Sequence, residues 1–170
     1  MAKGAGMIAP NMATMLSCIL TDAPLTADMA QQSLQHAAKT SFNRVSVDGH
    51  TSTNDTMLLL SSGQAAELPR EAMPAFQNAV DEISIQVAKM LVADGEGASH
   101  VIAIRVQGAA SDKDAEQIAR TVGASPLVKT AITGGDPNWG RIVSAAGYAE
   151  AKIDPPNVCL SICGTEIYRN

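Results

Sequence analysis

The chain has 170 residues, of which 46% are hydrophobic but only 3% aromatic, and a formal net charge of −5. This length suffices for one domain with a sizeable core, built here from aliphatic side chains and eight methionines. The chain contains no basic cluster, which disfavours nucleic-acid binding because phosphate contacts need Lys and Arg. No apolar run approaches the roughly 18 residues of a membrane-spanning helix.

The three cysteines are Cys18, Cys159 and Cys163. Their odd number and lack of framework spacing indicate a reducing compartment, and we expect a cytoplasmic protein without disulfides. All three lie in apolar runs, so burial as small hydrophobic side chains is the predicted state. We expect no metal site, because further ligands are not close by in the sequence.

The N-terminal stretch places Lys3 in a glycine-rich turn, eleven residues before Thr14. An apolar run at 15–20 follows and predicts a buried strand. If the Ala13–Thr14 bond were cut, Thr14 would present a hydroxyl beside an α-amine with a pKa of about 7.7, a self-contained nucleophile and base. Threonine is also common in strands because it is β-branched, so the residues alone leave both interpretations open. The lysine-ended pattern of a P-loop is absent.

A helix is expected at 26–39, with Thr26 as its N-cap. Alternation at 42–47 predicts a strand, and residues 48–50 a turn. Residues 51–56 form a cluster of hydroxyl, amide and carboxyl side chains. The cluster fits either a set of caps for the apolar element at 57–60 or a group that orders a neighbouring nucleophile.

The strongest helical pattern covers 69–92, with Pro74 allowing a later start. The residues expected on its buried stripe are Met73, Phe76, Val80, Ile83, Val87, Met90 and Leu91. A loop at 94–98 follows, in which Gly95 suits a left-handed position after the helix. Glu96 lies between two glycines, where a carboxylate is usually a solvated surface charge.

In the second half, residues 100–106 predict a strand and 112–122 a helix stopped by Gly123. Ser111 is its expected cap, with Asp114 completing a capping box. A short helix opens at Ser125-Pro126. A further helix is expected at 137–147, with Asp136 as N-cap and Trp139 packed between helix and sheet. A hairpin is expected from a strand at 158–163, a turn at 164–165 and a return strand at 166–169.

Helices and strands mix along the whole chain, which predicts an α/β fold with helices packed on mixed sheets. The return strand is cut short and would leave unpaired backbone groups at a sheet edge. We therefore expect the chain to be a piece of a longer protein, truncated at its C-terminal end.

Four stretches together resemble the ornithine acetyltransferase family, the bifunctional glutamate N-acetyltransferases of arginine biosynthesis. They are KGAGMIAPNMATML at 3–16, VDGHTSTNDT at 47–56, DGEGA at 94–98 and GDPNWGR at 135–141. The stretches follow the family's order and span most of the chain. His50 stands where the family usually has an acidic residue, which leaves the local charge open.

The resemblance implies a layered α-β-β-α sandwich, incomplete here at both ends, with residues 1–13 upstream of a processing site and 14–170 as one domain. It implies self-cleavage between Ala13 and Thr14, after which Thr14 takes the acetyl group of N-acetylornithine, releases ornithine and passes the acetyl group to glutamate. It assigns amino-acid binding to Lys3 and Glu96. No cofactor is implied, although some family members accept acetyl-CoA as donor.

The resemblance also implies that groups outside these 170 residues complete the site, because the family's oxyanion-hole donors precede the processing segment. A complementary chain or segment is therefore an expected partner, and an oligomer is expected. Two alternatives stay open: a non-catalytic or incomplete fragment, and an aminopeptidase-like hydrolase with an N-terminal threonine.

Overall fold

The computed structural model describes residues 1–8, 15–51 and 53–170. The chain forms two compact units, Met1–Ala98 and Ser99–Asn170. Each is described by itself.

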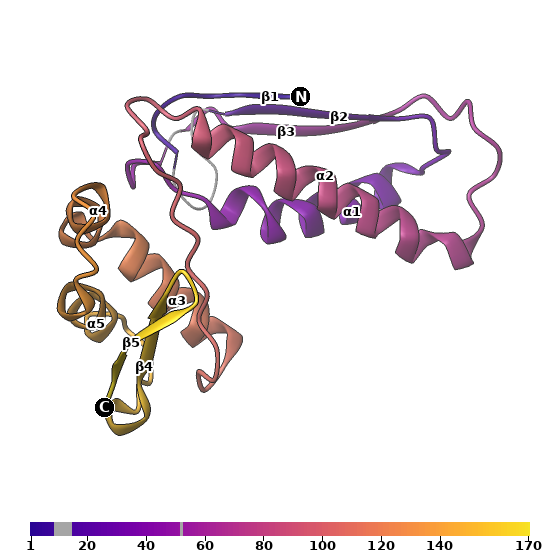
Figure 1. Ribbon diagram of the computed structural model, residues 1–170. Coiled ribbons are helices and arrows are strands. Elements are labelled where there is room, and N and C mark those ends of the chain that lie inside the picture. Colours follow the sequence, from indigo (N-terminus) through magenta and orange to yellow (C-terminus); the bar gives the residue numbers. More distant parts are fainter. Residues whose placement is uncertain (9–14, 52) are drawn as a thin grey trace. The chain divides into compact units, whose positions relative to one another are not determined.

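The first unit contains a three-stranded sheet in the order β1-β2-β3 (Figure 1). Its strands are β1 at Ala2–Lys3, β2 at Leu16–Thr21 and β3 at Thr56–Ser61. Strand β1 is antiparallel to β2, and β3 is parallel to it. A parallel pair needs a crossover connection, and helix α1 lies within it. The strand predicted at 15–20 is thereby confirmed, and the apolar element at 57–60 forms the strand beside it.

Both helices of this unit start close to their predicted positions. Helix α1 spans Ala27–Thr40, and the Thr26 hydroxyl caps it by accepting the Met29 amide. Helix α2 spans Met73–Ala93 after a 3-10 turn at Arg70–Ala72. Pro74 lies in its first turn, where the missing N–H costs nothing.

The core forms between one face of the sheet and the two helices. Ser17, Ile19 and Met57 are buried on the sheet. Small side chains line the helices, including Ser33 and Ala37 on α1 and Ser84 and Ala88 on α2. Such residues let two helices approach closely. The buried residues of this core cluster are Ile8, Met15, Ile19, Ala37, Phe42, Met57, Val80, Ala88 and Leu91.

The predicted stripe of α2 was partly wrong. Val80 and Leu91 are buried, but Met90 is 68% exposed and Ile83 is also exposed. The buried face instead follows Val80, Ser84, Ala88 and Leu91. Periodicity of large apolar side chains missed it because close helix packing selects small residues.

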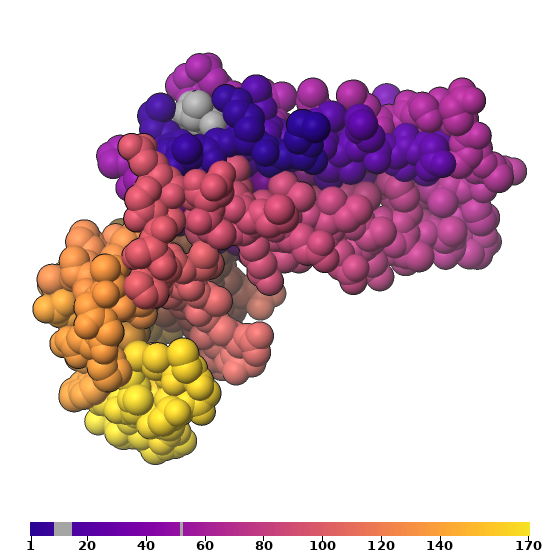
Figure 2. Space-filling view, turned by 45° about the horizontal axis from the view of Figure 1, so that its top comes forward, coloured from indigo at the N-terminus to yellow at the C-terminus, as the bar shows by residue number. Residues whose placement is uncertain are grey.

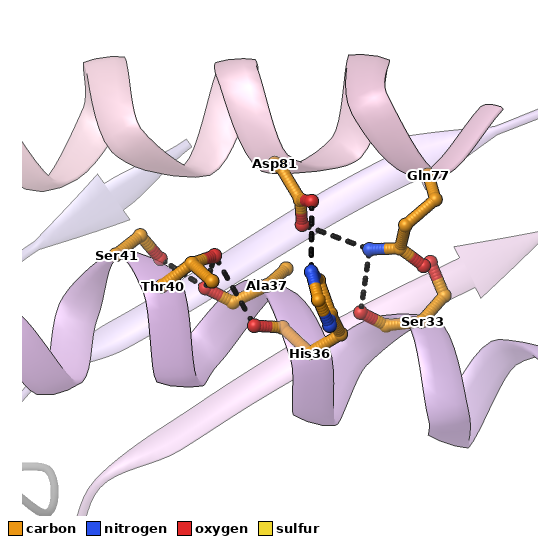
Figure 3. A network of polar contacts seen from close by, with 7 residues as sticks. All are labelled: Ser33, His36, Ala37, Thr40, Ser41, Gln77 and Asp81. Atoms are coloured by element: carbon orange, nitrogen blue, oxygen red, sulfur yellow. Dashed lines mark hydrogen bonds and ion pairs between the residues drawn. The ribbon is translucent and has the colours of Figure 1, made fainter. Parts of the chain in front are cut away.

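A polar network joins the two helices beside this core (Figure 3). The His36 Nε2 atom lies 3.2 Å from Asp81 Oδ2. Gln77 donates to Asp81 at 2.8 Å and to the Ser33 carbonyl at 3.3 Å. These contacts fix the position of α1 along α2 with polar groups from both helices.

The opposite face of the sheet presents leucines to solvent. Leu16, Leu20, Leu58 and Leu60 are all exposed, Leu20 by 75%. The register pairs Cys18 with Leu58 and Leu20 with Leu60, so these side chains share one face. Figure 2 shows the N-terminal segment in indigo along the surface of this unit, beside the pink residues of α2.

The strand predicted at 42–47 was wrong. Phe42–Arg44 form a 3-10 turn directly after α1, and the Phe42 side chain is buried in the core. After this turn, the chain makes an isolated backbone hydrogen bond to a distant segment: the Val47 amide donates to the Ile8 carbonyl at 2.7 Å. Alternation alone therefore did not produce a strand.

The second unit contains three helices and a hairpin (Figure 1). The helices are α3 at Asp112–Ala124, α4 at Pro126–Thr133 and α5 at Trp139–Gly147. The strands are β4 at Cys159–Ile162 and β5 at Thr165–Arg169, paired antiparallel. Val122, Val128 and Ala145 form the buried core between the helices.

The predicted caps of α3 and α4 are confirmed. Ser111 accepts the Asp114 amide and donates to its carboxylate, and Ser125 accepts the Val128 amide. The cap of α5 is Asn138 and not Asp136. Helix α3 also continues past Gly123 to Ala124, because glycine tolerates helical geometry when its neighbours supply the packing.

Two further predictions in this unit were wrong. Residues 100–106 form no strand. The hairpin turn lies at Cys163 and Gly164, with φ of 49° and 82°, one residue earlier than predicted. Two positive φ values are typical of the type I′ turn that two-residue hairpins favour.

Trp139 stacks on Tyr168 of β5, with ring centroids 4.6 Å apart. The predicted contact between helix and sheet is thus confirmed, although 47% of Trp139 stays exposed. The predicted burial of the cysteines was wrong, since Cys159 and Cys163 are exposed and Cys18 is half-buried. Cys159 and Cys163 lie in the two-stranded β4–β5 hairpin, and Cys18 lies on the face of β2 that also carries the exposed leucines. In the described residues, no helix is long and apolar enough to cross a membrane.

Candidate active site at the glycine-rich turn

Lys3 lies on the short strand β1, directly opposite Leu16 at the start of β2. Leu16 follows Thr14 by two residues in the sequence, so the register brings Lys3 close to the strand that Thr14 precedes. The lysine side chain is exposed. Within the described ranges its ammonium group makes no hydrogen bond or ion pair, and it is available to an anionic ligand.

Backbone hydrogen bonds tie the turn after Lys3 to two distant loops. The Ala5 carbonyl accepts the Glu96 amide at 2.7 Å, and the Ile8 carbonyl accepts the Val47 amide at 2.7 Å. The loop after α2 and the loop before β3 therefore both meet the glycine-rich turn.

Gly6 lies between two carboxylates in this arrangement. A Cβ atom at Gly6 would lie 3.6 Å from Glu96 Oε2 and 3.7 Å from Asp48 Oδ2. The Glu96 side chain is exposed, and in the described part of the chain it forms no ion pair. Glu96 and Asp48 thus place negative charge beside the turn that begins at Lys3.

The backbone conformations of the two glycines around Glu96 differ from the prediction. Gly97 has a φ of 69°, whereas Gly95 is not among the residues with positive φ. Gly95 is buried, and a Cβ atom there would lie 3.2 Å from Val47 Cγ2. Close packing therefore requires glycine at 95, and backbone conformation favours it at 97.

Asp48 fixes the geometry of the turn through two backbone amides. Its Oδ2 atom accepts the Met7 amide at 2.6 Å, and Oδ1 accepts the His50 amide at 3.0 Å. Burial alone would raise the pKa of Asp48, but hydrogen bonds from His50 and Met7 outweigh it and hold this pKa below its ordinary value. The His50 ring, 3.9 Å from Oδ1, adds to the lowering.

Asp55 fixes the start of β2. Its Oδ1 atom accepts the Met15 amide at 2.7 Å, and the Met15 carbonyl accepts the Thr56 amide at 2.9 Å. The Oδ2 atom of Asp55 is buried and has no hydrogen-bond partner among the described residues. One carboxylate oxygen thus holds the backbone while the other is left unpaired.

Of the residues predicted for the site, Glu96 meets the glycine-rich turn at Ala5, and Lys3 lies two residues before Ala5 on β1. Ala13 and Thr14 lie outside the described residues. Asp48 and Asp55 were not predicted individually, although the polar stretch that contains Asp55 was singled out. No cluster of metal-binding side chains is found in the residues that the structure describes.

Among the described residues, the turn that begins at the exposed Lys3 also meets the carboxylates of Glu96 and Asp48, of which Asp48 already accepts two backbone amides. An amino acid has a carboxylate and an ammonium group, for which such side chains are the natural partners through charge-assisted hydrogen bonds. The charges at this turn are of the two signs that a small zwitterionic ligand would need.

A family model described as the ArgJ family matches residues 1–170. The chain belongs to the ArgJ family. Membership accounts for the four sequence stretches together, three of which supply the contacts around the glycine-rich turn.

Individual ArgJ relatives extend over almost the whole chain. The arginine biosynthesis bifunctional protein ArgJ of Rhodopirellula baltica is 58% identical over 100% of this chain and 43% of its own length. The mitochondrial ArgJ protein of Schizosaccharomyces pombe is 47% identical over 97% of this chain and 39% of its own. The chain thus spans less than half the length of these curated relatives.

The crystal structure of ArgJ from Bacillus halodurans has a TM-score of 0.85 to this model. It is 38% identical, and the match covers 90% of this chain and 74% of that one. The mixed α/β architecture is therefore that of a solved ArgJ protein. The cytoplasmic location remains a prediction, since relatives include a protein named as mitochondrial.

Proposed function

We propose that this ArgJ chain belongs to an acetyltransferase that moves an acetyl group from N-acetylornithine to glutamate, with Thr14 as nucleophile. Hydrolysis of the Ala13–Thr14 bond consumes one water and frees the α-amine of Thr14. A neutral amine of this kind can act as base for the hydroxyl on the same residue.

The transfer proceeds in two steps. The Thr14 hydroxyl oxygen attacks the acetyl carbonyl while its proton passes to the α-amine, and that proton leaves with the departing ornithine nitrogen as the amide bond breaks. The amine of glutamate then attacks the acetyl ester. It forms N-acetylglutamate and returns a proton to the threonine oxygen.

The observation that best supports this proposal is the position of Lys3 and Glu96. Lys3 pairs with Leu16, two residues after Thr14, and Glu96 binds the backbone of Ala5 in the same turn. We assign the substrate carboxylate to Lys3 and the ammonium group to Glu96. In N-acetylornithine that ammonium is the side-chain one, because the α-nitrogen is acetylated.

The proposal includes a complementary segment or chain. An oxyanion hole is needed, because losing a single donor typically costs about 10²–10³ in rate. The exposed leucine face of the sheet supports the four-layer sandwich, since a second sheet packed on it would bury Leu16, Leu20, Leu58 and Leu60. Acetyl-CoA stays an alternative donor within the proposal.

The intact mass of the purified 170-residue chain is the first test. Loss of residues 1–13 would show that processing needs no further segment, whereas a full-length mass would restrict the proposal to the complete protein. The complete protein is then assayed for transfer from N-acetylornithine to glutamate. Thr14→Ala should abolish both cleavage and transfer, and Glu82→Gln, an exposed position on α2, should change neither.

The identity of the acetyl acceptor distinguishes the proposed acetyltransferase from a hydrolase and from a non-catalytic chain. Acetate release that does not respond to glutamate, or release of N-terminal residues from peptides, would identify a hydrolase. Complete processing without any acyl transfer would contradict the proposal and favour a non-catalytic chain.

A further inference from the structure

Met7 has a backbone conformation that a residue with a Cβ atom rarely adopts. Its φ is 51°, and among the described non-glycine residues only Cys163 also has a positive φ. Cys163 belongs to a two-residue hairpin turn, which requires that conformation. The residues on either side of Met7 are not in strands, so no such turn accounts for it. Its side chain is 49% exposed, and core packing does not account for it either. Surrounding contacts must therefore hold Met7 left-handed.

One loop supplies the contacts that hold Met7. The Met7 amide donates to Asp48 Oδ2 at 2.6 Å, across 41 residues of sequence. The carbonyl of the next residue, Ile8, accepts the Val47 amide at 2.7 Å. The bond to Asp48 is charge-assisted and belongs to the stronger class of hydrogen bonds. Because Ile8 is buried in the core, the conformation of Met7 decides in which direction the glycine-rich turn leaves that anchor.

The direction set at Met7 brings the glycine-rich turn against Glu96. The Ala5 carbonyl, two residues before Met7, accepts the Glu96 amide at 2.7 Å. A Cβ atom at Gly6 would lie 3.6 Å from Glu96 Oε2 and 3.7 Å from Asp48 Oδ2. A change of φ at Met7 would therefore carry Ala5 and Gly6 away from Glu96.

We propose that Asp48 is a positioning residue for amino-acid binding: it holds Met7 left-handed and thereby keeps the glycine-rich turn against Glu96. This inference rests on the proposed function, in which Glu96 receives the ammonium group of the substrate. Asp48 acts without touching the substrate, because its two oxygens already accept backbone amides. Its loss should misplace the Glu96 loop and weaken substrate binding.

A pair of substitutions at Met7 separates this role from a second one. Asp48 also accepts the His50 amide at 3.0 Å, and loss of that bond would disturb the loop by another route. Met7→Gly removes the conformational penalty, because glycine adopts positive φ without one. Met7→Ala is the matched control, since it removes the same half-exposed side chain but keeps the Cβ atom. Rescue of an Asp48 variant by glycine and not by alanine is therefore specific to the left-handed residue.

The experiment uses the complete ArgJ protein with Asp48→Ala and Asp48→Asn, each alone and combined with Met7→Gly or Met7→Ala. Intact mass follows processing, and KM and kcat for N-acetylornithine and glutamate are measured on the processed protein. Asp48→Ala should raise both KM values about tenfold with a smaller change in kcat, as expected when a charge-assisted hydrogen bond to the substrate is weakened. Asp48→Asn keeps an acceptor oxygen and should raise them less.

Met7→Gly should bring the KM values of Asp48→Ala back to within about threefold of wild type, whereas Met7→Ala should not. The left-handed penalty of a non-glycine residue corresponds to a population ratio of about tenfold, so removing it recovers most of the loss. The inference is overturned if glycine gives no more recovery than alanine, or if Asp48→Ala keeps the wild-type KM values. If Asp48→Ala does not fold, the same comparison in Asp48→Asn decides.

Hydrogen exchange of the peptide that contains Glu96 tests the inference without activity. The Ala5 carbonyl holds the Glu96 amide, so exchange should be faster in Asp48→Ala and return toward wild type when Met7→Gly is added. Unchanged exchange in Asp48→Ala would contradict the inference. Failure of the proposed function looks different, because the processed wild-type protein would then transfer no acetyl group while exchange at Glu96 still responded to Asp48 and Met7.

Discussion

Replacing Gly95 with alanine should destabilise the Met1–Ala98 unit by crowding the base of the Glu96 loop. The new Cβ atom would lie 3.1 Å from the Val92 carbonyl oxygen, and 3.2 and 3.3 Å from the two methyl carbons of Val47. Real Cβ contacts are rarely this short, so backbone and Val47 must shift by a few tenths of an ångström. Overpacking of this kind costs about 1–3 kcal/mol.

Gly97 provides a matched comparison, because alanine there would be strained by backbone conformation and not by crowding. A Cβ atom there meets nothing within 4 Å, but φ is 69°. Alanine at Gly97 should therefore cost about 1–2 kcal/mol through backbone strain alone. Gly147→Ala in α5 is the control, since it meets neither obstacle.

Urea unfolding followed by circular dichroism gives the three free energies of unfolding. If Gly95→Ala unfolds at the wild-type midpoint, the Val47 contact is not a close one and the reasoning is refuted. If Gly95→Ala is destabilised as expected, the activity of the complete protein should also fall, because Glu96 follows the displaced residue.

Three further outcomes are expected. Asp48→Asn should be less stable than wild type above pH 4, and the difference should vanish as acid titrates Asp48. The lowered pKa of Asp48 means that its carboxylate stabilises the fold only while the carboxylate is ionised. Urea unfolding midpoints measured against pH would show this. Ser84→Ala should leave stability unchanged or raise it by up to about 1 kcal/mol in thermal unfolding, since its buried hydroxyl has no partner among the described residues. Trp139→Ala should lose the stacking on Tyr168, worth about 0.5–1.5 kcal/mol beyond buried area, which hydrogen exchange of the hairpin amides would report.

The helices were predictable because their signals are local. Thr26, Ser111 and Ser125 each accept an amide three residues on, and that information lies within one turn of sequence. Strands are different because each needs a partner. Residues 42–47 and 100–106 alternate as strands do, but the described chain pairs neither with a neighbour.

The site was only partly predictable for the same reason. Lys3 and Glu96 were identified by resemblance, whereas Asp48 and Asp55 act on amides 41 and 40 residues away. Nothing in the local sequence indicates those partners. The left-handed position assigned to Gly95 lies instead at Gly97, and the glycine at 95 is explained by its close approach to Val47, a contact that helix-ending rules do not include.

One loop holds both flanks of residues 9–14. Val47 binds the Ile8 carbonyl and Asp48 binds the Met7 amide, while Asp55 binds the Met15 amide. The polar side chains between Asp48 and Asp55 thus belong to a segment that fixes where the chain enters and leaves the predicted processing site. A segment whose flanking residues are fixed has less conformational entropy to lose on reaching a reactive geometry. This constraint gives a physical reason for polar residues in a loop that neither helix capping nor strand pairing requires.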